Sequence, residues 1–119
     1  MANEITITAG LVLTNGNLSV KVNPESTRFD QVTRRGGGPG TVDVGTVEQT
    51  VDFGGIVPGF VILKNLDDTN FVELGFSSGV YGIKLQPGSL ALFELVAGTS
   101  VFVKADTADC AVQITAINA

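Results

Sequence analysis

Five segments decide the fold of this chain: FVELGF (residues 71–76), VYGIKL (80–85), SLALFELV (89–96), SVFVKA (100–105) and CAVQITAI (110–117). Within them apolar and polar residues largely alternate, and turn-forming residues such as Gly, Pro, Asp and Ser fill the gaps. The sequence therefore predicts an all-β protein, an antiparallel β-sandwich of about 8–10 short strands with no significant helix.

The N-terminal part of the sequence predicts a β-hairpin. Residues 4–8 alternate between apolar and polar, and residues 11–13 extend or pair with this strand. Asn15-Gly16 follows, and Asn-Gly is the strongest short-range hairpin signal. Residues 17–22 form the expected return strand. Its predicted inward-facing side chains are Leu18, Val20 and Val22.

The next part of the sequence predicts irregular structure. Residues 23–27 (NPEST) break the strand pattern, and residues 34–40 (RRGGGPG) contain three consecutive glycines. Ordering glycine costs more backbone entropy than ordering any other residue. We therefore expect a mobile loop at residues 34–40. We also expect a single β-sandwich domain over residues 1–119, because neither flank of this loop makes a complete domain alone.

The composition excludes several classes of function. The net charge of −5 argues against a large phosphate-binding face. The chain contains no His, which removes the usual activating base of a Ser or Cys nucleophile. We therefore expect no enzyme, no cofactor and no metal. The single cysteine, Cys110, lies in an alternating segment and is expected to be a buried small hydrophobe.

No sequence feature indicates a membrane or an export signal. No apolar run approaches the roughly 18 residues that a membrane-spanning helix needs. The first residues lack the basic and apolar regions of a signal peptide, so we expect synthesis in the cytoplasm.

Two predicted strands are apolar on both faces. They are FVIL (residues 60–63) and LALF (residues 90–93). One face of each strand in an isolated sandwich meets water and should be polar. Either another subunit covers the second face or a loop over residues 23–40 does. Because only 16% of the residues are charged, we expect the subunit. The candidate contact residues are Phe60, Ile62, Leu90 and Leu92.

Two further motifs have both a functional and a simple structural interpretation. Arg34 and Arg35 could dock on a carboxylate-rich partner, since Arg forms bidentate contacts, or could be solvated loop residues. Residues 65–70 (NLDDTN) concentrate oxygen ligands that suit a cation such as calcium. The same side chains cap their own backbone in turns, and this second interpretation is the one we expect.

The chain resembles small virion proteins of tailed bacteriophages over about residues 14–117. The resemblance lies in four stretches, in the same order: TVDVGTV (41–47) after the Gly-rich tract, GFVILKNLDDTNFVELG (59–75), KLQPGSLALF (84–93) and KADTA (104–108). These motifs are turn and strand signals, and none of them is catalytic.

The resemblance implies a jelly-roll-like β-sandwich built into a virus particle. It implies a capsid decoration, or cement, protein on the capsid surface, synthesised in the host cytoplasm. Its partners would be the major capsid protein and other copies of itself, most simply as a homotrimer. A neck or tail component of the virion is the nearest alternative. A carbohydrate-binding β-sandwich is an alternative from a different class.

Overall fold

The computed structural model describes residues 3–118, which form strands, turns and loops. The described chain divides between Thr33 and Arg34 into two compact units. Where the sequence led us to expect one domain over residues 1–119, the N-terminal residues form a unit of their own. No helix that could span a membrane occurs in the described part of the chain.

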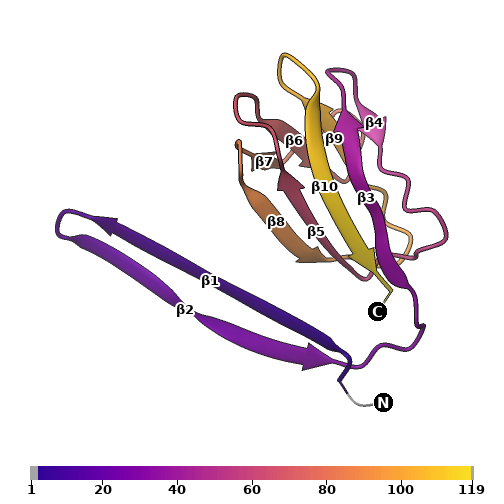
Figure 1. Cartoon of the computed structure of the whole chain (residues 1–119), viewed down its shortest axis with the longest axis horizontal. Coiled ribbons are helices and arrows are strands. Elements are labelled where there is room, and N and C mark those ends of the chain that lie inside the picture. Colours follow the sequence, from indigo (N-terminus) through magenta and orange to yellow (C-terminus); the bar gives the residue numbers. More distant parts are fainter. Residues whose placement is uncertain (1–2, 119) are drawn as a thin grey trace. The chain divides into compact units, whose positions relative to one another are not determined.

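The first unit is a two-stranded antiparallel hairpin of β1 (Ile5–Asn15) and β2 (Leu18–Phe29) (Figure 1). Asn15 pairs with Leu18, so Gly16 and Asn17 are the two turn residues. Gly16 has a φ of 57°, and of the two turn residues only this glycine has a positive φ. This is the pattern of a type II′ turn, which joins antiparallel strands without splaying them.

The expected break at residues 23–27 is instead a β-bulge inside β2. The register shifts between Ala9 and Leu11, where Gly10 faces Asn23 and Pro24. A bulge tolerates proline, because the extra residue need not donate a ladder hydrogen bond. A Cβ at Gly10 would lie 3.1 Å from the Pro24 nitrogen, so only glycine allows this close approach without a shift.

The second unit contains eight strands in two four-stranded antiparallel sheets (Figure 1). The first sheet has the order β3-β10-β5-β8, and the second has the order β4-β9-β6-β7. The strands are β3 (Gly36–Val44), β4 (Gln49–Thr50), β5 (Phe60–Asn65), β6 (Val72–Gly75), β7 (Ile83–Leu85), β8 (Leu90–Glu94), β9 (Phe102–Ala105) and β10 (Cys110–Ile117).

The pairing of these eight strands is nested. β3 pairs with β10, β4 with β9, β5 with β8 and β6 with β7. The first strand of the unit thus lies beside the last, the second beside the next to last, and so on inward. This is how a long hairpin wraps into two sheets of four, the jelly-roll arrangement. The predicted all-β, jelly-roll-like sandwich is confirmed.

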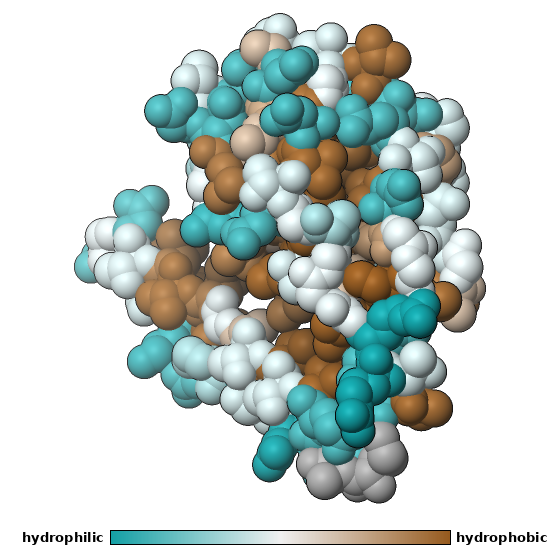
Figure 2. All heavy atoms as spheres, turned by 45° about the vertical axis from the view of Figure 1, so that its right-hand side comes forward, coloured by the Kyte–Doolittle hydropathy of each residue, from teal (hydrophilic) through white to brown (hydrophobic). Residues whose placement is uncertain are grey.

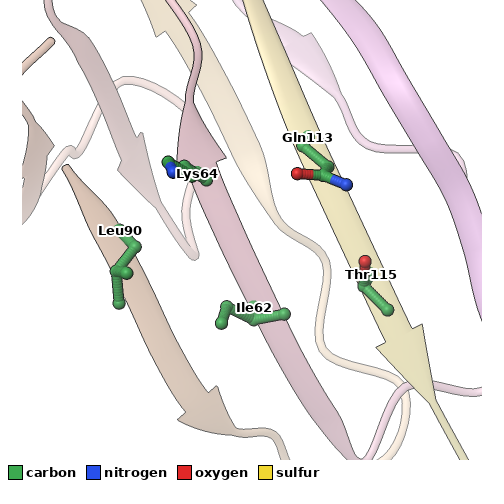
Figure 3. A pocket seen from close by; sticks show the side chains of 5 residues that line it. All are labelled: Ile62, Lys64, Leu90, Gln113 and Thr115. Carbon is green, nitrogen blue, oxygen red and sulfur yellow. The ribbon is translucent and has the colours of Figure 1, made fainter. Parts of the chain in front are cut away.

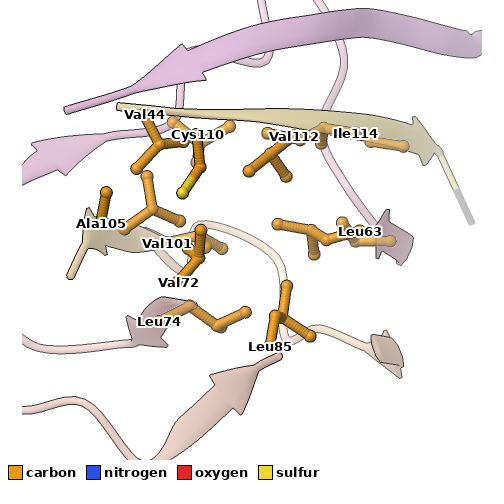
Figure 4. Packing of buried hydrophobic residues seen from close by; sticks show 14 residues of the cluster. Val44, Leu63, Val72, Leu74, Leu85, Val101, Ala105, Cys110, Val112 and Ile114 are labelled. Carbon is orange, nitrogen blue, oxygen red and sulfur yellow. The ribbon is translucent and has the colours of Figure 1, made fainter. Parts of the chain in front are cut away.

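Aliphatic side chains from both sheets fill the space between them (Figure 4). Leu63, Val112 and Ile114 from the first sheet face Leu74 and Leu85 from the second, and all are at most 1% exposed. Such alternating inward residues form the core of a sandwich. Cys110 is part of this core, as predicted. Burial raises the pKa of its thiol, which keeps the sulfur in the unreactive protonated form.

The Gly-rich tract is a strand where a loop was expected. Residues 36–40 begin β3 and pair with the end of β10. A Cβ at Gly36 would lie 2.6 Å from Cγ2 of Ile117, so β10 leaves no room for a side chain there. Gly37 and Gly40 have φ values of 104° and 95°, which L-residues rarely adopt. The glycines therefore fit an edge strand that a bulkier sequence could not form.

Candidate interaction surfaces

The two-sided strands meet on the outer face of the sheet β3-β10-β5-β8. Ile62 pairs with Leu92 in the β5–β8 ladder, and Lys64 pairs with Leu90. Paired residues in a ladder point to the same side of the sheet, and so do residues two apart along a strand. The register therefore places Ile62, Leu90 and Leu92 together on this side. We call these three residues the apolar sheet face.

A shallow hollow of about 140 Å³ lies on this side of the sheet. Ile62, Lys64 and Leu90 line it together with Gln113 and Thr115, and all five side chains stand on the same side of their strands (Figure 3). Ile62 is 38% exposed and Leu90 is 57% exposed. Phe60 lies in the same alternating row, but it is only 7% exposed and offers little free surface.

The outer face of the opposite sheet is charged. Glu73 of β6 pairs with Lys84 of β7 on one side and with Lys104 of β9 on the other. The Lys84 ammonium lies 4.5 Å from the centre of the Phe71 ring, and the Lys104 ammonium lies 5.9 Å from that of Tyr81. Cross-strand rows of opposite charge suit a face that meets water. The two outer faces of the sandwich therefore differ in chemistry.

Residues 23–40, the alternative cover, form regular strands over most of their length. Residues 23–29 belong to β2 and residues 36–40 belong to β3. β3 pairs edge to edge with β10, so residues 36–40 extend the sheet. Ile62 and Leu90 are exposed.

Arg34 and Arg35 have different surroundings in the structure. Nη1 of Arg35 donates a hydrogen bond of 2.7 Å to the carbonyl of Gly55. The carbonyl of Arg35 accepts a hydrogen bond from the amide of Asn118, so both parts of this residue hold the sandwich together. Arg34 is exposed. A partner contact through either arginine remains a prediction.

The segment 65–70 is held by its own side chains. Oδ1 of Asn65 accepts from the amide of Asp67, and Oδ2 of Asp67 accepts from the amides of Thr69 and Asn70 at 3.0 and 2.6 Å. The amides of Asn70 and Thr69 hold the pKa of Asp67 below its ordinary value. Within residues 3–118, no group of three or more His, Cys, Asp or Glu is placed to hold a metal ion. The hydrogen bonds match the capping interpretation of this segment.

Glu48 forms a cluster that no local sequence pattern predicts. Its carboxylate accepts hydrogen bonds from the Ser78 hydroxyl at 2.6 Å, the Gly79 amide at 2.7 Å and the Tyr81 hydroxyl. The donors lie 30 to 33 residues away along the chain. These bonds, with that to Ser78 first, lower the pKa of Glu48, and the bond from Tyr81 raises the pKa of that phenol. The cluster ties the β3–β4 loop to the turn before β7.

The Glu48 cluster makes the stability of the sandwich depend on pH. A carboxyl whose pKa is lower in the folded state stabilises the fold above its unfolded pKa, and this contribution disappears as the pH falls through the folded value. We expect Glu48→Gln to unfold at a lower urea concentration than the wild type at pH 7. The difference should shrink as the pH falls below the ordinary value of 4.5. Exposed Glu94, changed to Gln, is the control. An equal deficit of Glu48→Gln at pH 7 and at pH 3 would contradict this role.

The hairpin carries a second apolar surface. Leu11 pairs with Val22 and Leu13 pairs with Val20, and Leu18 lies two residues before Val20 on the same side. These five side chains are 42% to 63% exposed. We call them the apolar hairpin face. The predicted common face of Leu18, Val20 and Val22 is confirmed, but these side chains are not buried in the described chain.

The opposite side of the same hairpin segment is mostly polar. There Val12 pairs with Lys21 and Thr14 pairs with Ser19. Hydrophobic side chains reach the surface of the molecule at several places, between polar ones (Figure 2).

No protein-family model, curated protein or solved structure matches this chain.

Proposed function

We propose that this protein is a structural component of a phage virion, a decoration protein that binds the outside of the capsid as an oligomer. The observation that carries the proposal is the apolar sheet face, exposed Ile62 and Leu90 with half-buried Leu92, on a sandwich whose other outer face is charged. The resemblance to small phage virion proteins supports the choice of partner. An apolar face of this kind is typical of stable interfaces, which are less charged than the remaining surface.

The proposed action is mechanical. Each sandwich contacts the major capsid protein through its apolar sheet face, and the oligomer repeats this contact on neighbouring capsid subunits. Binding of the second and third sandwich is then intramolecular, so modest single affinities combine into stable attachment. The bridged subunits separate less readily, which reinforces the shell.

Two other roles use the same fold. A neck or tail component would use the apolar sheet face on a different part of the virion. Jelly-roll folds also occur in sugar-binding domains, so the fold itself leaves this class open. The hydroxyl of Tyr81, the single tyrosine, is held by Glu48, which makes it a poor free platform for a sugar ring. This favours the structural role.

Attachment to particles tests the proposal. We expect Leu90→Glu to reduce occupancy on undecorated capsids by at least about tenfold, because a carboxylate would be desolvated in the contact. Val96→Glu is the matched control, since Val96 is 81% exposed and lies outside the apolar sheet face. The measurement is quantitative gel analysis of protein that sediments with the capsids. Equal occupancy of both variants and the wild type would overturn the assignment of this face.

A further inference from the structure

Two features of the hairpin are unfavourable for an element that is exposed to water. Among the described residues it forms a sheet of only two strands, and a two-stranded hairpin is at best marginally stable in water. Towards the turn, five aliphatic side chains on one side, Leu11, Leu13, Leu18, Val20 and Val22, are all exposed. Something must cover this side for the hairpin to persist.

The outer edges of the hairpin are also unfavourable in water. β1 pairs only with β2 in the described chain, so each strand has one edge without a ladder partner. Free edges of this kind readily pair with another chain, and closure into a barrel removes them. A partner that covered only the apolar side chains would leave the two strand edges unpaired.

We propose that the hairpins of three copies of this chain close into one six-stranded antiparallel barrel, with the apolar hairpin faces inside. β1 of each copy pairs with β2 of the next copy, which is antiparallel to it because the two strands of every hairpin run in opposite directions. A contact of this head-to-tail type closes into a ring when the rotation fits. The inference rests on the proposed role as an oligomeric shell protein and names the element that builds the oligomer.

The amphipathic pattern fits such a barrel. Small closed barrels are filled by inward-facing side chains that alternate with outward-facing ones. The inward set would be the five aliphatic residues of the apolar hairpin face, with Asn15 on the same side, opposite Leu18 at the turn end of the ladder. The outward set would include Thr14, Ser19 and Lys21, which lie on the opposite side. Lys21 is the single charged residue between positions 10 and 22, so no charge would enter the barrel.

The bulge marks where the barrel would end. Glu25 pairs with Ala9 just beyond the bulge and is the first charged residue on the side of the apolar hairpin face. Bulges bend a strand and interrupt its ladder. The barrel would therefore use the five ladder pairs from Leu11–Val22 to Asn15–Leu18, and Glu25 would lie outside it.

The size of the hairpin argues for other copies of the chain, and for more than two. Five residues span about 17 Å, and two strands with their side chains are about 10 Å wide. A flat contact between two such faces is far smaller than the roughly 800 Å² that each partner contributes to a stable complex. In a closed ring each hairpin contacts two neighbours through its edges and its face. Two hairpins would give only four strands, fewer than the five strands of an OB barrel.

Two adjacent residues provide a matched test. Leu11 is 63% exposed and Val12 is 65% exposed, but they point to opposite sides of the hairpin. Wild type, Leu11→Glu and Val12→Glu are compared by size exclusion with multi-angle light scattering. We expect wild type and Val12→Glu at three times the 12.3 kDa chain mass. Three carboxylates inside the barrel should weaken association of Leu11→Glu by on the order of a hundredfold or more.

Circular dichroism shows whether the sandwich of each variant is folded. Dissociation of the trimer can therefore be distinguished from unfolding of the chain. A monomeric or tetrameric wild type, or a Leu11→Glu variant that stays trimeric, would overturn the inference. Dissociation of Val12→Glu to the same degree would overturn it as well. The measurement contains no capsid, so its failure leaves the proposed capsid binding testable, and failure to bind capsids leaves the trimer testable.

Discussion

Gly75→Ala is expected to destabilise the sandwich by about 3 kcal/mol or more. A Cβ at this position would lie 1.9 Å from the carbonyl oxygen of Val80, and real Cβ atoms do not approach backbone so closely. Gly75 is buried at the end of β6, where it pairs with Phe102 of β9. The chain segment that crosses it would have to move, and the β6–β9 ladder would move with it.

Gly82→Ala is the control for this prediction. Gly82 lies in the neighbouring segment, a Cβ added to it would have no heavy atom within 4 Å beyond its chain neighbours, and its φ is not positive. We expect the stability of this variant to stay within about 0.5 kcal/mol of the wild type. Urea unfolding followed by circular dichroism measures both variants. If Gly75→Ala unfolds at the wild-type midpoint, the close approach of Val80 is not part of the native packing.

Asn65→Leu is the second change with a large expected effect. Asn65 is completely buried at the end of β5, and its amide nitrogen donates to the carbonyls of Asn70 and Leu85 at 2.9 and 3.1 Å. Its side-chain oxygen accepts from the amide of Asp67. Leucine fills a similar volume but leaves these three backbone groups without their partner. Each such loss costs about 1 to 3 kcal/mol, so we expect a total of about 3 kcal/mol or more.

Lys64→Ala separates this effect from a general weakness of β5. Lys64 is the adjacent residue, and its side chain points to the outer side of the sheet. Removing it should change the free energy of unfolding by no more than about 0.5 kcal/mol. Thermal unfolding of the two variants provides the comparison. An Asn65→Leu protein as stable as the Lys64→Ala protein would show that the Asn65 hydrogen bonds do not hold the fold.

The strands were predictable where short-range rules decide them. The alternation of CAVQITAI over residues 110–117 gives a strand whose buried residues are Cys110, Val112, Ile114 and Ala116. Asn15-Gly16 likewise predicts a hairpin turn at this place, although the two turn residues are Gly16 and Asn17. The two-sided character of the strands that carry Ile62 and Leu90 is visible in the sequence as well.

The remaining features depend on partners that are distant in the sequence. The strand at residues 36–40 exists because β10 pairs with it, so the local glycine content led to the opposite expectation. Glu48 meets Ser78 and Tyr81 through loops whose approach no local pattern encodes. The pairing of Ile62 with Leu92 requires the register of β5 and β8, which alternation alone does not fix.

The two apolar surfaces suggest a division of roles within the chain. The apolar hairpin face lies on residues 11–22, where Lys21 is the single charged residue and each strand has one edge without a ladder partner in the described chain, which suits pairing with identical copies. The apolar sheet face lies on a stable sandwich, and Lys64 and Gln113 line the hollow beside it, a mixture typical of contacts with a different protein. We propose that the first surface builds the oligomer and the second attaches it to the capsid.

The number of copies per purified particle, relative to the major capsid protein, tests the proposed function most directly. A decoration protein should be present in a fixed ratio to the major capsid protein, because its binding sites repeat with the capsid lattice. Quantitative mass spectrometry of purified virions measures this ratio. We expect the number of copies of this protein to be in proportion to the number of major capsid proteins in the whole shell. Absence from the particle, or a small set of copies at one vertex, would contradict the proposed role.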